Sequence, residues 1–168
     1  MIPIDGATSM VDQQALASCG TCRANRGELP TPGGVIYQDA WWRAEHIIEP
    51  IPLAGWLVLK PLRHVEAFAD LTLEEAASFG PLVRRITMAM REVLKPTKIY
   101  VCQFSEAQDF AHIHFHLIPR FAATPPESRG PGVFDLLSEA ASQGRNLADV
   151  SAAAGVVAAV RERIRTTD

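Results

Sequence analysis

Three of the five histidines of this 168-residue chain lie within five residues of one another, at His112, His114 and His116. Side chains alternate across a β-strand, so one strand face is expected to carry all three imidazoles, with the apolar residues between them on the other. Imidazole titrates near neutral pH and can act as a nucleophile, a proton donor or a metal ligand. Phosphate chemistry suits such a column, with one ring attacking phosphorus. A metal site formed by the three histidines is less favoured, because side chains at neighbouring positions on one strand diverge poorly around a tetrahedral ion. A solvent-facing strand that happens to use histidine stays open, although such faces ordinarily carry Thr, Lys, Glu or Arg.

Cys19 and Cys22 form a second group of chemically capable side chains. A single C-x-x-C motif is compatible with a redox pair, half of a zinc site or two small core residues. The redox pair is the least favoured, because the motif does not follow a strand and open a helix as thioredoxin-like motifs do. Cys102 lies in a strand pattern and is interpreted as a core residue.

The segments around these residues predict an α+β fold. Strands are expected at 35–38, 41–48, 56–60, 99–104 and 113–118, where β-rich or apolar runs are bounded by turn residues. The sequence from Thr72 to Glu75 has the form of a capping box and opens a long helical pattern that Pro96 ends. We therefore expect an antiparallel sheet with one long helix packed across it. A Gly/Pro-rich excursion at 125–132 and an Ala-rich helix at 147–164 form the predicted C-terminal helical extension.

Composition excludes several classes of function. The formal net charge of −3 gives no overall basic field that would attract a nucleic acid polymer. No apolar run approaches the roughly 20 residues that cross a bilayer, so no membrane contact is expected. The first residues lack the basic start and apolar stretch of a secretory signal, which predicts a cytoplasmic location. An odd number of cysteines, three, also argues against a disulfide framework.

Two segments resemble a known family. Residues 112–118 (HIHFHLI) resemble the His-x-His-x-His signature of the histidine-triad (HIT) superfamily, in which apolar residues separate and follow the histidines. Residues 55–65 (GWLVLKPLRHV) resemble the Gly-His-x-Leu-Val-x-Pro-x-x-His strand and turn of the same family. The predicted long helix lies between the two segments, as in that family. The resemblance divides the chain into an N-terminal arm at 1–18, a HIT domain at 19–121 and a C-terminal extension at 122–168.

The resemblance implies an enzyme that cleaves or exchanges a bond at the α-phosphate of a nucleotide. His114 would be the nucleophile that forms a nucleotidyl-histidine intermediate, and His116 would contact the phosphate and assist the leaving group. A neutral imidazole can attack without prior deprotonation, which suits this role. Dinucleoside polyphosphates and nucleoside phosphoramidates are the implied substrates, no organic cofactor is implied, and a homodimer is expected by analogy. The alternative is a non-catalytic purine nucleotide-binding module with a structural zinc.

The resemblance also implies a use for the cysteine pair. Some relatives combine such a pair with a histidine after the Pro-containing turn and with the first histidine of the triad. The matching residues here are His64 and His112, so Cys19, Cys22, His64 and His112 would form a structural Cys₂His₂ zinc site. A metal-free pair is the competing interpretation.

The resemblance also implies residues that contact the nucleotide, and one of these positions departs from the family pattern. Glu49 lies near the position that contacts the ribose, and Gln103 lies where some branches place a phosphate-contacting residue. Gln108 matches the glutamine of the pattern Gly-Gln-Ser/Thr-x-x-His, but Asp109 replaces its hydroxyl residue. A carboxylate beside a phosphate is unfavourable unless it is protonated, turned toward a histidine or acting as a base. Asp109 is therefore a candidate catalytic residue, and also the feature that favours the binding module.

Overall fold

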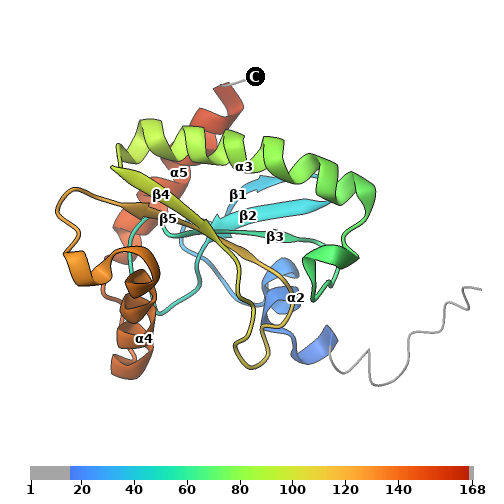
Figure 1. Cartoon of the computed structure of the whole chain (residues 1–168), viewed down its shortest axis with the longest axis horizontal. Coiled ribbons are helices and arrows are strands. Elements are labelled where there is room, and N and C mark those ends of the chain that lie inside the picture. Colours follow the sequence, from blue (N-terminus) through green and yellow to red (C-terminus); the bar gives the residue numbers. More distant parts are fainter. Residues whose placement is uncertain (1–15, 167–168) are drawn as a thin grey trace, which may run out of the picture.

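The structure is a computed structural model that describes residues 16–166, and it is built around one antiparallel sheet (Figure 1). The five strands lie in the order β1-β2-β3-β5-β4, so the strand that carries the last triad histidine is next to the edge strand β4. Their bounds are Val35–Gln38 (β1), Trp42–His46 (β2), Leu57–Pro61 (β3), Lys98–Cys102 (β4) and Phe115–Arg120 (β5). The five predicted strands and the α+β class are confirmed, with shifts of one to two residues at several ends.

Helices α3 (Leu73–Leu94) and α5 (Val150–Thr166) cover one face of the sheet (Figure 1). Thr72 and Glu75 form the predicted capping box, which satisfies backbone donors at the start of α3. The main core lies between the sheet and these two helices. It includes buried side chains from β3, α3 and α5, among them Leu57, Leu59, Ile86, Met90, Val157, Val160 and Ile164. No helix within residues 16–166 is long and apolar enough to cross a membrane.

The opposite face of the sheet is covered by α4 (Val133–Gln143), which the sequence analysis did not predict (Figure 1). The extension therefore contains two helices, α4 and α5, where one was expected. Two 3₁₀ turns, Pro126–Ser128 and Gly130–Gly132, occupy the Gly/Pro-rich segment just before it. Apolar side chains at helical spacing along α4 pack on a second core with residues of the sheet, which includes Ile47, Trp56, Val58, Ile118, Val133 and Phe134. This face of the sheet also carries His116, so α4 borders the candidate site.

The cysteine pair lies at the start of a short helix, α2 (Gly20–Asn25). Cys19 is the N-cap residue of α2, and its sulfur accepts a hydrogen bond from the Cys22 backbone N–H at 3.4 Å. Most of the predicted N-terminal arm, residues 1–15, lies outside the described residues, and residues 16–18 are helical. The motif thus opens a helix, but that helix does not follow a strand.

Candidate functional site

The histidine segment enters the sheet later than its sequence pattern predicts. Strand β5 begins at Phe115, so only His116 lies within it, whereas His112 and His114 belong to the extended chain just before it. The alternation nevertheless continues through the segment, because Ile113 and Phe115 are buried in the main core while the histidines point elsewhere. The three histidines then divide between two environments. The His114 and His116 rings are neighbours, with centroids 5.0 Å apart, whereas His112 lies beside His64 at the same centroid distance.

The hydrogen bonds of His114 define which of its ring nitrogens carries the proton. Its Nδ1 lies 2.9 Å from the backbone carbonyl oxygen of His112, which can only accept, so Nδ1–H is the donor. The neutral ring therefore keeps its lone pair on Nε2. Ser105 supports this arrangement: its Oγ accepts the backbone N–H of His114 at 3.1 Å and lies 3.3 Å from Nδ1. Burial lowers the pKa of His114, which keeps the ring neutral near neutral pH.

His116 is held by aromatic side chains from β3 and α4. The indole N–H of Trp56 donates to His116 Nδ1 at 2.9 Å. The ring of Phe134 stands perpendicular to both, with centroids 5.4 Å from that of Trp56 and 5.4 Å from that of His116. Burial, and then the neighbouring His114, lower the pKa of His116 to about 3. His116 is therefore a neutral imidazole at any pH near neutrality.

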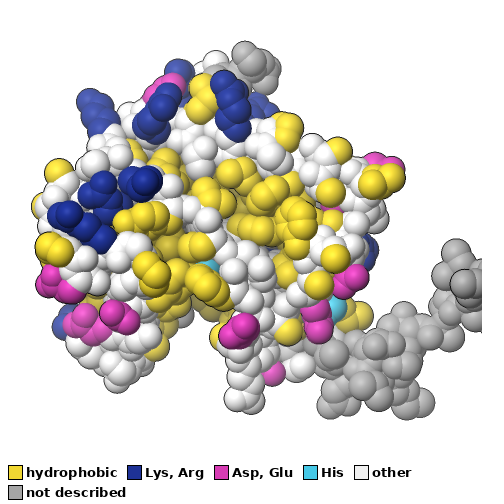
Figure 2. All heavy atoms as spheres, viewed as in Figure 1, with side chains coloured by type: hydrophobic (Ala, Val, Ile, Leu, Met, Phe, Trp, Pro, Cys, Tyr) yellow, Lys and Arg dark blue, Asp and Glu magenta, His cyan; other side chains and the backbone are white. Residues whose placement is uncertain are grey.

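A notch in the surface separates α4 from the loop that joins β4 to β5 (Figure 2). Histidine atoms are visible at its head, and apolar side chains line its walls and extend over the adjoining surface. Phe104, in the loop, is an exposed apolar residue of this region, and its ring packs against Phe134 at a centroid distance of 5.1 Å. A ligand that reaches the histidines through this notch meets apolar surface on both sides.

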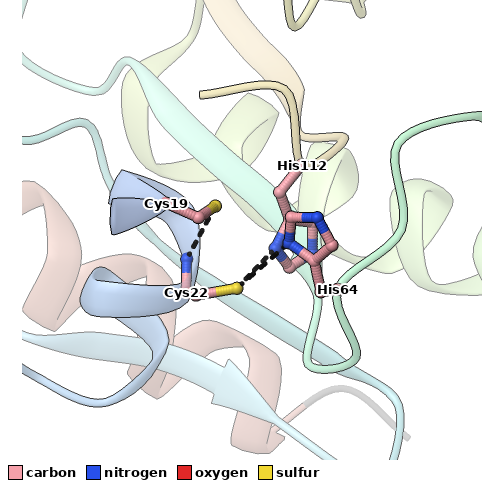
Figure 3. Close-up of side chains that lie close together, drawn as sticks. All are labelled: Cys19, Cys22, His64 and His112. Atoms are coloured by element: carbon pink, nitrogen blue, oxygen red, sulfur yellow. Dashed lines mark hydrogen bonds between the residues drawn. The ribbon is translucent and has the colours of Figure 1, made fainter. Parts of the chain in front are cut away.

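The structure brings Cys19, Cys22, His64 and His112 together, as Figure 3 shows. Their ligand atoms all lie within 4.8 Å of one another. The Cys22 sulfur lies 3.3 Å from His64 Nδ1 and 3.4 Å from His112 Nδ1. These distances are close to the N-to-S edge of a tetrahedron around Zn²⁺, about 3.6 Å for Zn–S and Zn–N bonds of about 2.3 and 2.05 Å. The four residues fit a tetrahedral metal ion with both histidines bound through Nδ1.

Burial controls the charge of this group. It raises the pKa of the Cys22 thiol to about 12 and, with the charges nearby, lowers the pKa of His112 to about 3. A divalent cation favours the thiolate strongly, so two bound thiolates would give a neutral centre with Zn²⁺. His112 Nε2 is buried and has no hydrogen-bond partner among the described residues. Ligation through Nδ1 would leave the proton on that nitrogen.

Helix α2 docks on the loop before the triad through Gly20. Its backbone N–H donates to the Asp109 carbonyl at 2.6 Å. A Cβ at position 20 would lie 2.3 Å from the ring of Phe110, so only glycine allows this approach. The metal-ligand group and the loop that carries Gln108 and Asp109 are therefore mechanically connected.

The structure places the four remaining predicted site residues outside hydrogen-bond contact with the triad. The side chains of Gln103, Gln108 and Asp109 form no hydrogen bond or ion pair with any part of residues 16–166, and the latter two are exposed. Asp109 adopts a left-handed conformation, with φ of 64°. Glu49 is exposed, and its carboxylate accepts a hydrogen bond at 3.3 Å from Asn146, in the segment between α4 and α5. Their roles in nucleotide binding or catalysis stay predictions.

Two features near the triad were not anticipated from the sequence. His46 is fully buried, and its Nε2 accepts the Gly55 N–H at 3.0 Å, which fixes the loop between β2 and β3. Lys60 and Glu45 form a buried ion pair on adjacent strands, and Arg43 also contacts the Glu45 carboxylate at 2.9 Å. No local pattern in the sequence signals either arrangement, because both depend on strand register.

Comparison with known proteins gives the family of this chain. The family model of the HIT domain matches residues 28–123. Over 111 residues, 62% of this chain and 72% of the relative, the chain is 24% identical to the "Protein hit" of Bacillus subtilis. It is 25% identical to an uncharacterized HIT-like protein of Methanocaldococcus jannaschii over 109 residues, 61% of this chain and 79% of that protein. The chain belongs to the HIT family.

Solved structures of the same fold include a zinc-bound histidine triad protein and a diadenosine triphosphate hydrolase. A Zn-bound histidine triad family protein from Mycobacterium smegmatis aligns with a TM-score of 0.66 at 20% identity, covering 90% of this chain and 99% of that chain. The diadenosine triphosphate hydrolase of Plasmodium falciparum, in complex with Cyclomarin A, aligns with a TM-score of 0.58 at 15% identity, covering 82% and 80%. At these identities the alignments show a common fold.

Proposed function

We propose that this protein is a nucleotide hydrolase or nucleotidyltransferase that cleaves at an α-phosphate through a covalent nucleotidyl-His114 intermediate. The observation that carries the proposal is the hydrogen bond from His114 Nδ1–H to the His112 carbonyl, which leaves the Nε2 lone pair available for attack. Family membership and a diadenosine triphosphate hydrolase of the same fold support it. Dinucleoside polyphosphates and nucleoside phosphoramidates are the proposed substrates.

The proposed reaction has two displacements at phosphorus. His114 Nε2 forms a bond to the α-phosphorus while the bond to the leaving group breaks, and the leaving group takes up a proton from solvent. Water, which loses a proton to solvent, or inorganic phosphate then displaces the histidine and restores its lone pair. His116 contacts the phosphate and assists departure of the leaving group. Phe110, whose ring centroid lies 6.4 Å from that of His114, helps to exclude water from the reacting nitrogen.

Zinc would have a structural role in this proposal. Cys19, Cys22, His64 and His112 would hold it, joining α2 and the turn after β3 to the segment that carries the triad. When bound, the ion supplies folding free energy and fixes His112. Since the His112 carbonyl is the acceptor for His114, a fixed His112 also fixes the nucleophile. The Zn-bound relative of the same fold supports this assignment.

The second candidate function is a non-catalytic purine nucleotide-binding module with a structural zinc. Asp109 favours it, because an exposed carboxylate at the position of a family hydroxyl residue would repel a phosphate. The variant Asp109→Ser would restore the hydroxyl. A rise in turnover in that variant would indicate an enzyme weakened by the carboxylate.

The test is a product assay with adenosine 5′-phosphoramidate, diadenosine triphosphate and diadenosine tetraphosphate, each with and without inorganic phosphate. A hydrolase releases AMP without phosphate, whereas a phosphorylase requires phosphate and yields ADP from the tetraphosphate.

In an acid-quenched reaction, mass spectrometry should find the nucleotidyl group on the peptide that contains His114. His114→Ala should abolish turnover and retain the circular dichroism spectrum of the folded protein. Full activity in that variant would refute the mechanism, and AMP binding without turnover in the wild type would support the binding module.

We also propose a homodimer in which the β4 edges of two copies come together. Strand β4 is at the end of the sheet, and its unpaired edge can accept another strand. At the other end, α5 contacts β1. Val101 of β4 and Phe104, two residues beyond this strand, are exposed apolar residues near the open edge, and their burial between two copies would favour association.

A further inference from the structure

Trp56 and His116 form a buried pair across β3 and β5. The indole N–H lies 2.9 Å from His116 Nδ1, and the two rings are nearly perpendicular, at 86°. Trp56 is fully buried and His116 is 7% exposed. The register of the sheet positions the pair, because His116 is opposite Val58 and Trp56 immediately precedes β3. Neither ring can leave this contact without disturbing the second core.

An indole ring has one polar hydrogen and no acceptor. His116 Nδ1 must therefore accept, and the proton of the neutral ring must be on Nε2. Within residues 16–166 the ring forms no other hydrogen bond, so the contact with Trp56 alone selects the tautomer. A proton on Nδ1 would place two donors face to face in a buried site, which is costly. That cost opposes both the other neutral tautomer and the imidazolium.

The neighbouring triad histidine has the opposite tautomer. His114 donates from Nδ1 to the His112 carbonyl and keeps a lone pair on Nε2, whereas His116 accepts at Nδ1 and keeps a proton on Nε2. The ring centroids are only 5.0 Å apart. One ring thus has a nucleophilic nitrogen and the other a hydrogen-bond donor, and neither has to gain or lose a proton first. The two rings can bind the same phosphate group in complementary ways.

We propose that Trp56 is a positioning residue that holds His116 in the Nε2–H tautomer, so that His116 meets the α-phosphate as a neutral hydrogen-bond donor. The catalytic part of this inference rests on the proposed function. The tautomer itself belongs to the unliganded protein and is measurable without any substrate. In the segment that resembles the HIT strand and turn, Trp56 occupies a position where the pattern has histidine. A histidine there could donate or accept, so it would not select one tautomer of His116.

The test is long-range ¹H–¹⁵N correlation spectroscopy of the histidine rings in the unliganded protein at neutral pH, with His116→Asn used to assign the His116 signals. In the wild type, Nδ1 should show the signature of an unprotonated nitrogen and Nε2 that of a protonated one. Trp56→Phe should show both tautomers. Trp42→Phe is the matched control: Trp42 is equally buried, but its indole N–H donates to Ser78 at 2.9 Å. This variant should keep the wild-type tautomer of His116.

A wild-type His116 protonated on Nδ1, or present as an equal mixture, would overturn the proposal even if neither variant folds. So would a folded Trp56→Phe variant with an unchanged His116 spectrum. In the product assay, Trp56→Phe should lower kcat about tenfold and change KM less than about twofold, as expected for the loss of one oriented donor. Absence of turnover in the wild type would refute the proposed function and leave the tautomer result standing.

Discussion

The burial of His116 predicts a specific loss of stability in acid. In the folded protein the pKa of His116 is lowered to about 3, chiefly by burial, whereas a histidine in an unfolded chain titrates at about 6.5. Between these two values the unfolded chain binds a proton that the folded protein does not. The stabilisation is therefore fully present above about pH 6.5 and is lost progressively as the pH falls toward about 3.

The size of the effect follows from the difference between the two pKa values. Each pH unit below about 6.5 shifts the unfolding free energy by about 1.4 kcal/mol, so the contribution of His116 at about pH 5 is a loss of about 2 kcal/mol. Such a loss is a sizeable part of the 5–15 kcal/mol that typically stabilises a domain. The Trp56 N–H also opposes protonation of His116, because it donates to Nδ1, the nitrogen that must gain the proton.

The assay compares urea unfolding of the wild type and His116→Asn at about pH 8 and about pH 5, because one titrating group differs between them. Asparagine is a suitable replacement, since its side-chain oxygen can still accept the Trp56 N–H. Contributions from the other histidines and from zinc release are common to both proteins and cancel in the difference. The wild type should lose about 2 kcal/mol more than the variant over this range.

Parallel loss of stability in the two proteins would refute the argument. It would mean that His116 gains its proton in the folded state at an ordinary pH, and hence that water reaches the ring past Phe134. A direct titration of the His116 ring signals by NMR would then give a pKa near the unfolded value of about 6.5.

Three further predictions concern the surroundings of the triad. Protein purified without a polyhistidine tag should contain about one zinc per chain by elemental analysis, and Cys22→Ser less than about a tenth of that; a zinc-free wild type would count against the metal site. Gly20→Ala should lower the unfolding free energy by about 1–3 kcal/mol, because its Cβ would collide with Phe110. The control is Gly155→Ala in α5, whose Cβ meets no atom within 4 Å and which should raise the unfolding free energy slightly. Equal effects of the two substitutions would contradict the docking of α2 on the loop before the triad. Val101→Asp on the exposed edge strand should convert a dimer to a monomer in light scattering, and an unchanged mass would exclude this interface.

Local sequence patterns predicted most of the scaffold. The strands are short apolar or β-branched runs between turn residues, and Thr72 and Glu75 form a capping box, so each feature is encoded within a few residues. Helix α4 was missed because 3₁₀ turns and a Gly/Pro-rich segment precede it and its apolar spacing spans only eleven residues. Its amphipathic pattern, with Phe134 and Leu137 toward the sheet, was nevertheless present in the sequence.

The site was only partly predictable, for a physical reason. The grouping of His64 and His112 with the cysteine pair was anticipated through the family resemblance, and the structure brings the four side chains together. Pairings such as Trp56 with His116 depend on which strands are neighbours and in which register. Sequence spacing carries no record of that choice, because the partners are 60 residues apart.

The contact between α5 and β1 has a consequence for how the protein is made. Arg161 of α5 donates to the backbone carbonyl of Val35, and Val157 and Val160 complete the core beneath the sheet. All five strands precede α5 in the chain, so during translation the strands are made before the helix that covers their apolar surface. Folding of the sheet is therefore coupled to synthesis of a helix that lies beyond residues 28–123, the region matched by the HIT family model. Until that helix arrives, the nascent chain is a candidate client for chaperones.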